Sequence, residues 1–229
     1  MKNDMTIGEI VALDYRAASV FKEAGIDFCC GGKKSLNETC SEKGINQNEL
    51  LGKLKNLESA PNKGIHNFIE WEPGFLCDYI VKTHHKYVMK SMPELLSCTD
   101  KIASVHGERH PELAVVADLF SQINHELLQH MKKEEEVLFP AIKEAISLRS
   151  EKAKEVIISE IARLSEEHEF AGGAMDRINV ITSDYQVPAD GCNTYNVAFK
   201  LLREFEDDLH THVHLENNIL FPKALKSAN

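Results

Sequence analysis

Two segments far apart in the chain are nearly alike, and they decide the fold. Residues 130–142 read HMKKEEEVLFPAI and residues 212–224 read HVHLENNILFPKA. In each segment a glutamate follows a histidine by four residues, and a β-branched residue and Leu-Phe-Pro come next. Residues four apart lie on one face of an α-helix, so each copy places a histidine beside a glutamate. The two pairs are His130 with Glu134 and His212 with Glu216.

Both pairs interrupt apolar stripes whose spacing of three and four residues is typical of helices that face a core. A third stripe has one histidine, His168, at its middle. The stripes run through Leu113, Val116, Phe120, Ile123, Leu127, Val137 and Ala141; through Leu202, Phe205, Leu209, Ile219 and Leu220; and through Ile157, Ile161, Leu164, Ala171, Met175 and Ile178. These periods predict that imidazoles and carboxylates point into the protein interior.

A metal site explains these polar groups best. An unpaired buried carboxylate costs several kcal/mol, and packing alone does not account for two of them beside several imidazoles. Imidazole with carboxylate suits iron, manganese or zinc, and two carboxylates able to bridge favour a pair of ions. These stripes carry no cysteine, which argues against a resident iron–sulfur cluster. For His168 taken alone, a hydrogen-bonded core histidine is the commoner alternative.

The helix that precedes these three offers two further ligand candidates, His84 and His85. His85 shares a helical face with Val81, Val88, Met89, Met92 and Leu96, whereas His84 aligns with Ile80, Tyr87 and Leu95. The periodicity favours His85 only slightly. Three other histidines fall outside the stripes, and we expect solvent-facing or second-layer roles for them: His125, His210 and His214. In the run Glu134-Glu135-Glu136, only Glu134 is predicted to turn inward.

Four long helical segments are predicted after residue 70, and no strand-like alternation occurs. Their approximate limits are 73–98, 111–147, 151–183 and 193–226. Long helices joined by short loops pack as an antiparallel up-down-up-down bundle, which we assign to residues 70–229. A break at Ser59-Ala-Pro-Asn-Lys-Gly64 predicts a linker over 61–69.

Residues 1–60 are predicted to form a small domain of three short helices. Thr6 with Glu9 makes a capping box, Ser35 with Glu38 and Asn46 with Glu49 repeat that start signal, and Gly25 is placed to end the first helix. The loop after it, IDFCCGGKK, contains Cys29 and Cys30. Adjacent cysteines close only a strained disulfide ring, and the following lysines are expected to lower a thiol pKa, so we interpret the pair as reactive.

The composition limits the classes of partner. A formal charge of −10 over 229 residues argues against nucleic acid or anionic lipid as the main partner. No apolar run is long enough to span a membrane, and the first residues lack the pattern of a secretory signal, so we expect a cytoplasmic protein with reduced thiols. A homodimer stays open.

These motifs resemble a known family. Four helices that carry histidines and bridging carboxylates are similar to the hemerythrin-like di-iron bundle. The segment IDFCCGGKKSL resembles the small domain in front of such bundles in the iron–sulfur cluster repair proteins, the repair-of-iron-centres family. Alignment through Met92-Pro-Glu-Leu95 implies six ligands: His85, His130, Glu134, His168, His212 and Glu216. Four histidines and two carboxylates match the repair proteins rather than the oxygen-carrying hemerythrins, which use five histidines.

The resemblance implies repair of iron–sulfur clusters damaged by oxidative or nitrosative stress. It implies a cofactor of two non-haem iron ions, bridged by Glu134 and Glu216 and in some states by an oxo group, with damaged iron–sulfur proteins as partners and nitric oxide or dioxygen as small ligands. Cys29 and Cys30 are the candidate catalytic residues. Iron donation, nitric oxide reduction and a combination of the two stay open, so an enzymatic activity is left undecided. The alternatives are an oxygen- or nitric-oxide-binding sensor without turnover and a metal-free helical interaction protein.

Overall fold

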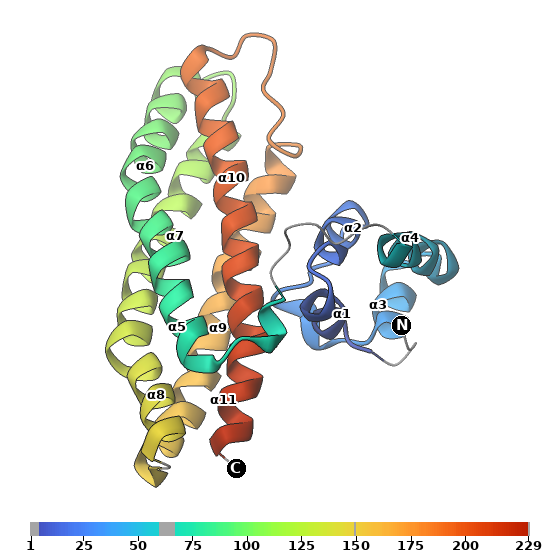
Figure 1. The fold of residues 1–229 in the computed structure, drawn as a ribbon. Coiled ribbons are helices and arrows are strands. Elements are labelled where there is room, and N and C mark those ends of the chain that lie inside the picture. The colour runs from blue at the N-terminus through green and yellow to red at the C-terminus, as the bar shows by residue number, and fades with distance from the viewer. Residues whose placement is uncertain (1–4, 60–66, 149, 229) are drawn as a thin grey trace.

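The all-α class predicted from the sequence is confirmed. The computed structural model describes residues 5–59, 67–148 and 150–228, and every regular element in these ranges is a helix. Figure 1 shows a long helical bundle with a smaller group of helices packed against one side of it. Within the described residues, no helix has both the length and the apolar character needed to cross a bilayer.

The front unit contains four α-helices rather than the three predicted: α1 (Ile7–Leu13), α2 (Ala17–Glu23), α3 (Leu36–Lys43) and α4 (Gln47–Ser59). The predicted first helix divides at Asp14, whose carboxylate accepts hydrogen bonds from the Arg16 backbone and guanidinium and so closes a turn. The predicted capping box of Thr6 and Glu9 is present, and Gly25 ends α2 at φ 65°. A short 3₁₀ turn, η1 (Gly31–Lys33), follows the cysteine pair.

The bundle consists of four helical rods, three of them interrupted. The first rod contains Pro93 inside a helix, and it extends beyond the predicted end at residue 98 to His106. The rods are α5 (Pro73–Ile80), η3 (Val81–His85) and α6 (Lys86–His106); α7 (Glu112–Lys133), η4 (Glu134–Leu138) and α8 (Phe139–Leu148); α9 (Glu151–Ile181); and α10 (Asn193–Leu215), η5 (Glu216–Leu220) and α11 (Phe221–Ala228). A 3₁₀ turn, η2 (Phe68–Glu70), precedes α5.

The three interruptions η3, η4 and η5 are π-helical turns. A π-turn contains one extra residue, which shifts the helical register, and such turns are often found at functional sites. The shift explains why Val137, predicted to be in the core, is 41% exposed while Leu138 is fully buried. Each of these turns contains at least one candidate ligand.

The bundle neighbours form a closed ring, because α6 and α9 each contact both α7 and α10. The apolar core is divided into two clusters along the bundle. One includes Val88, Leu127 and Leu209 together with the front unit, and the other includes Ile80, Leu138 and Leu220. A layer of buried histidines and glutamates lies between them.

The front unit packs on η5 through α1 and η1. The Asn218 side chain of η5 donates hydrogen bonds to the backbone carbonyls of Phe28 (3.3 Å) and Cys29 (3.1 Å). Most of the predicted linker, residues 61–66 of 61–69, lies outside the described residues. The domain limits 1–60, 61–69 and 70–229 therefore stay a prediction.

Candidate metal centre

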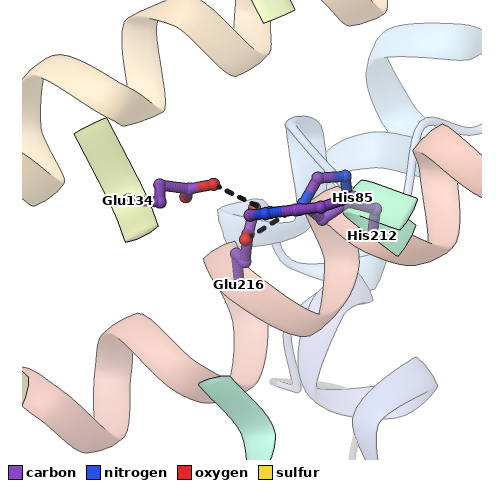
Figure 2. A group of neighbouring side chains, drawn as sticks. All are labelled: His85, Glu134, His212 and Glu216. Atoms are coloured by element: carbon purple, nitrogen blue, oxygen red, sulfur yellow. Dashed lines mark hydrogen bonds and ion pairs between the residues drawn. The ribbon is translucent and has the colours of Figure 1, made fainter. Parts of the chain in front are cut away.

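The structure brings the six predicted ligands together inside the bundle. Two groups of donor atoms each lie within 4.8 Å of one another. One group contains His85 and His212, the other contains His130 and His168, and both contain Glu134 and Glu216. Figure 2 shows the first group, with Glu134 directed at His85 and Glu216 at His212. The two groups are therefore adjacent and share both carboxylates.

The imidazoles surround the carboxylates at short range. The Glu134 Oε2 atom lies 3.3 Å from Nε2 of both His85 and His130. The Glu216 carboxylate lies 3.1 Å from Nε2 of both His168 and His212. Both glutamates are fully buried, and among the described residues their only ion-pair partners are histidines.

The unsatisfied atoms of this layer fit metal ions. The His85 Nε2, both oxygens of Glu134 and the Glu216 Oε2 atom are buried without a hydrogen-bond partner. The Nε2 atoms of His130 and His168 face each other at 3.0 Å, while each ring binds an acceptor through Nδ1. If each ring carries its proton on Nδ1, the Nε2 lone pairs of the two rings point toward the same position. A cation there removes the repulsion, and the donor set of imidazole and carboxylate suits iron, manganese or zinc.

Three of the rings are oriented through Nδ1 by acceptors that the sequence analysis missed. His85 binds Glu135 (2.8 Å), His130 binds Glu167 (2.9 Å) and His168 binds Asn217 (3.0 Å). Such partners fix the tautomer and the ring plane of metal-binding histidines. Each acceptor adjoins a predicted ligand in the sequence but serves a histidine of the neighbouring rod. That adjacency is the one sequence signal that could have found them.

The pKa values follow from the same contacts. Burial alone would lower the pKa of His130, but the charge and close approach of Glu134 and the hydrogen bond to Glu167 outweigh it and raise the pKa to about 10. Burial and the neighbouring carboxylate would raise the pKa of Glu134, but His130 and His85 reverse this and lower it. For Glu216, His212 and His168 outweigh burial, and the pKa lies well below its usual value. The site therefore holds two carboxylates in ionised form.

The structure separates His85 from His84, which the periodicity did not. His85 belongs to the first donor group, whereas His84 does not. The π-turn buries both rings, at 2% and 3% exposure. His84 binds Asp208 through Nδ1 (2.9 Å) and stacks on His212 with ring centroids 5.5 Å apart. His84 therefore packs against the candidate ligand His212.

The expectations for the histidines outside the stripes hold only in part. His125 is exposed as predicted, and Glu135 and Glu136 lie on the surface, although Glu135 orients His85. His214 is fully buried against the front unit, with its ring edge-on to Phe28 at 5.8 Å. Burial lowers its pKa to about 4. The periodicity of one helix shows which of its faces is buried in the bundle, but it does not reveal an interface with another domain.

The two predicted reactive cysteines lie beside the bundle. Cys29 is buried, and its thiol donates a hydrogen bond to Asp27 (3.2 Å). The Cys30 thiol donates to the backbone carbonyl of His168 (3.4 Å), so this loop touches the rod of a candidate ligand. Both line a groove of about 400 Å³ together with Asp176 and His210.

The expectation of a lowered thiol pKa is wrong for Cys29. Its contact with Cys30 and its burial raise the pKa well above the usual value. Lys34, which was expected to lower it, instead pairs with Glu42 (2.5 Å).

Comparisons with known proteins agree with both parts of the chain. Residues 78–224 match the Hemerythrin HHE cation binding domain, and residues 3–58 match a domain of unknown function, DUF542. The chain is 32% identical over 226 residues to the iron-sulfur cluster repair protein YtfE of Pectobacterium carotovorum, covering 97% of each chain. It is 34% identical over 218 residues to the iron-sulfur cluster repair protein ScdA of Staphylococcus epidermidis, covering 93% of this chain and 95% of the relative. The chain therefore belongs to the family of the iron–sulfur cluster repair proteins YtfE and ScdA, with a hemerythrin HHE cation-binding domain behind a DUF542 domain.

Proposed function

We propose that this chain is a non-haem di-iron protein that repairs iron–sulfur clusters damaged by oxidative or nitrosative stress. The observation that carries the proposal is the pair of donor groups that share Glu134 and Glu216. Shared carboxylates are typical of a bridged pair of ions, and the relatives YtfE and ScdA are named for cluster repair.

In this proposal the six side chains divide into two sets. His85 and His212 would hold one ion, His130 and His168 would hold the other, and the two glutamates, which belong to both donor groups, would serve both ions. Bound iron supplies redox cycling and an open position for a small ligand such as nitric oxide or dioxygen. The protein contributes fixed ligand directions through Glu135, Glu167 and Asn217, and two apolar clusters that enclose the site on both sides.

The cysteine loop is the proposed contact with a damaged client protein. Cys30 is half-buried, lines an open groove and touches the backbone of His168. A client thiolate or iron ion that enters this groove meets sulfur, carboxylate and imidazole groups next to the bundle. Cys29 is buried and its pKa is raised, so Cys30 is the more accessible of the two thiols.

The test combines metal analysis with a repair assay on full-length protein. We expect about two irons per chain in the wild type and recovery of an enzyme whose [4Fe–4S] cluster has been damaged by peroxide or nitric oxide. The double variant Cys29→Ser, Cys30→Ser should keep its iron and repair slowly. Cys40→Ser is the matched control, because Cys40 is a buried thiol of the same unit outside the groove.

The possible outcomes separate the proposal from its alternatives. Iron binding with reversible capture of nitric oxide or dioxygen, and no recovery of the client enzyme, would indicate a gas-binding module. Protein without iron after loading under anaerobic conditions would leave only a metal-free role. Repair at the wild-type rate by the double variant would assign the whole reaction to the bundle.

A further inference from the structure

A second thiol site lies at the end of the bundle where α10 begins, far from the candidate metal centre. Cys192 is exposed and is the N-cap residue of α10. Twenty residues of helix separate it from His212, a distance of about 30 Å at 1.5 Å per residue. Chemistry at Cys192 is therefore independent of the metal ligands.

The sulfur of Cys192 has a buried partner. The Nε2 atom of His106 lies 3.2 Å from the Cys192 Sγ atom. His106 is only 4% exposed, and its other ring nitrogen, Nδ1, has no hydrogen-bond partner. Buried imidazoles are normally bound to carbonyls or carboxylates. This ring instead packs edge-on against Tyr195 and directs its one engaged nitrogen at the thiol.

The two residues occupy helix ends of opposite polarity. His106 is the last residue of the 21-residue α6, where the carbonyl end of a helix favours positive charge. Cys192 caps the 23-residue α10, where free N–H groups favour negative charge. The N-terminal end of α10 therefore favours a Cys192 thiolate beside the His106 ring. The neighbouring charged side chains pair with one another: Arg109 (2.9 Å) and His110 (3.0 Å) both pair with Asp190.

Three other thiols, those of Cys40, Cys77 and Cys98, have different surroundings. Contact with His106, followed by the backbone N–H groups of Tyr195 and Thr194, lowers the pKa of Cys192 to about 7. Burial raises the pKa of Cys40 and Cys98, and raises that of Cys77 to about 12. Low pKa, exposure and a histidine partner are the features of cysteines that react with electrophiles.

We propose that Cys192 and His106 form a reactive thiolate site that takes up low-molecular-weight disulfides as a mixed disulfide. The Cys192 sulfur attacks one sulfur of the small disulfide, the original S–S bond breaks, and a new S–S bond joins the small thiol to the protein. The other half leaves as a thiolate, which takes a proton from the His106 ring or from water. One disulfide is consumed and one is formed, so no further oxidant is needed.

The experiment uses full-length, metal-loaded protein with oxidised glutathione as the probe. Peptide mass spectrometry after short incubations should find the first adduct at Cys192. Its alkylation rate by iodoacetamide, measured from pH 5.5 to 9.5, should be half-maximal near pH 7. His106 is the titratable side chain that acts on this thiol within the described residues.

His106→Gln removes the imidazole and keeps a polar side chain of similar reach. The half-point should rise toward 8.5, the value of an ordinary cysteine, while the backbone N–H groups at the start of α10 still lower it in part. The rate at pH 6 should fall by up to about sixfold, because the greater nucleophilicity of a more basic thiolate offsets part of the lost thiolate fraction. Cys98 in the same samples is the internal control, and its rate should not change.

Two results overturn the proposal. One is a wild-type half-point at 8.5 or above, or the absence of a glutathione adduct at Cys192 under excess probe. The other is a pH profile of Cys192 that is the same in the wild type and in His106→Gln. If the variant does not fold, as judged by circular dichroism, the wild-type profile and the adduct map decide the question by themselves.

Discussion

At the level of single residues, side chains of one rod orient the candidate ligands of a neighbouring rod. Glu135 on η4 orients His85 on η3, Glu167 on α9 orients His130 on α7, and Asn217 on η5 orients His168. His212, whose Nδ1 atom has no partner, is backed by the stacked ring of His84. Each rod thus positions the ligand of its neighbour, so the site depends on correct packing of all four.

The first prediction concerns the shared carboxylates. Replacing Glu134 or Glu216 with leucine should cut iron from about two per chain to one or fewer, because each carboxylate belongs to both donor groups. The bundle should keep its helical content, since the imidazoles can stay neutral. Glu136→Leu is the matched control, because Glu136 is exposed and next but one to Glu134. Metal analysis and circular dichroism measure both effects, and full iron content in both inner variants would contradict the assignment.

The second prediction concerns the orienting layer. Glu167→Gln should weaken iron binding about 10- to 100-fold and change the electronic spectrum, because the amide is a weaker acceptor for the His130 ring. Glu166→Gln should leave both unchanged, since Glu166 is an exposed neighbour. Competition with a chelator gives the affinities. Equal affinity for iron in the two variants would show that Glu167 only forms an ion pair with Lys133.

At the level of elements, the cysteine loop and η5 form one contact. Asn218 reaches the loop carbonyls because Gly32, packed beside it, has no side chain. A Cβ atom on Gly32 would lie 2.5 Å from the Asn218 Oδ1 atom. The amide could move away only by giving up its two hydrogen bonds to the loop. The glycine of the Cys-Cys-Gly-Gly motif therefore serves a close approach between the two units.

The third prediction follows from this contact. Gly32→Ala should loosen the loop and raise the alkylation rate of Cys29, which is 3% exposed in the intact structure, by about tenfold or more. Gly52→Ala is the control: nothing lies within 4 Å of the new methyl group, so this helical site should be neutral or stabilised by about 0.5–1 kcal/mol. Unchanged Cys29 alkylation in Gly32→Ala would show that the loop is held without Asn218.

At the level of the whole molecule, all candidate ligands lie on the bundle, while the cysteine pair lies on the front unit. The two parts nevertheless share one apolar cluster, and His214 of the bundle is buried against Phe28 of the front unit. A chain without the front unit must expose that surface. The metal centre and the fold stability therefore respond differently to truncation.

The fourth prediction tests this division. Residues 67–229 alone should bind iron with the full-length spectrum, because the six donors and their orienting partners are all retained. Loss of the Phe28 contact should lower the free energy of unfolding by about 1.5–3 kcal/mol, measured by urea titration of the metal-free forms. Cluster repair should be impaired together with the loss of Cys29 and Cys30. A truncated chain that folds but binds no iron would place a needed ligand in the front unit.

The sequence by itself determined the helical class, the four-rod bundle and the candidate ligands on the second, third and fourth rods. Helical periods report which face is buried, and a histidine or glutamate that breaks an apolar stripe is visible in the residues alone. The near-repeat of residues 130–142 and 212–224 carried most of this information. The choice of His85 over His84 came from the family resemblance.

Only the tertiary structure decided the features that depend on register or on another segment. Three π-turns each add a residue to the helical period, which exposes Val137 and buries both His84 and His85. Glu135, Glu167 and Asn217 act on histidines of other rods, and His214 is covered by another unit, so no pattern within one helix reveals them. Cys192 and His106 are 86 residues apart and meet only because the bundle brings the end of α6 to the start of α10. Local periodicity records burial, but contact between distant segments is decided when the chain folds.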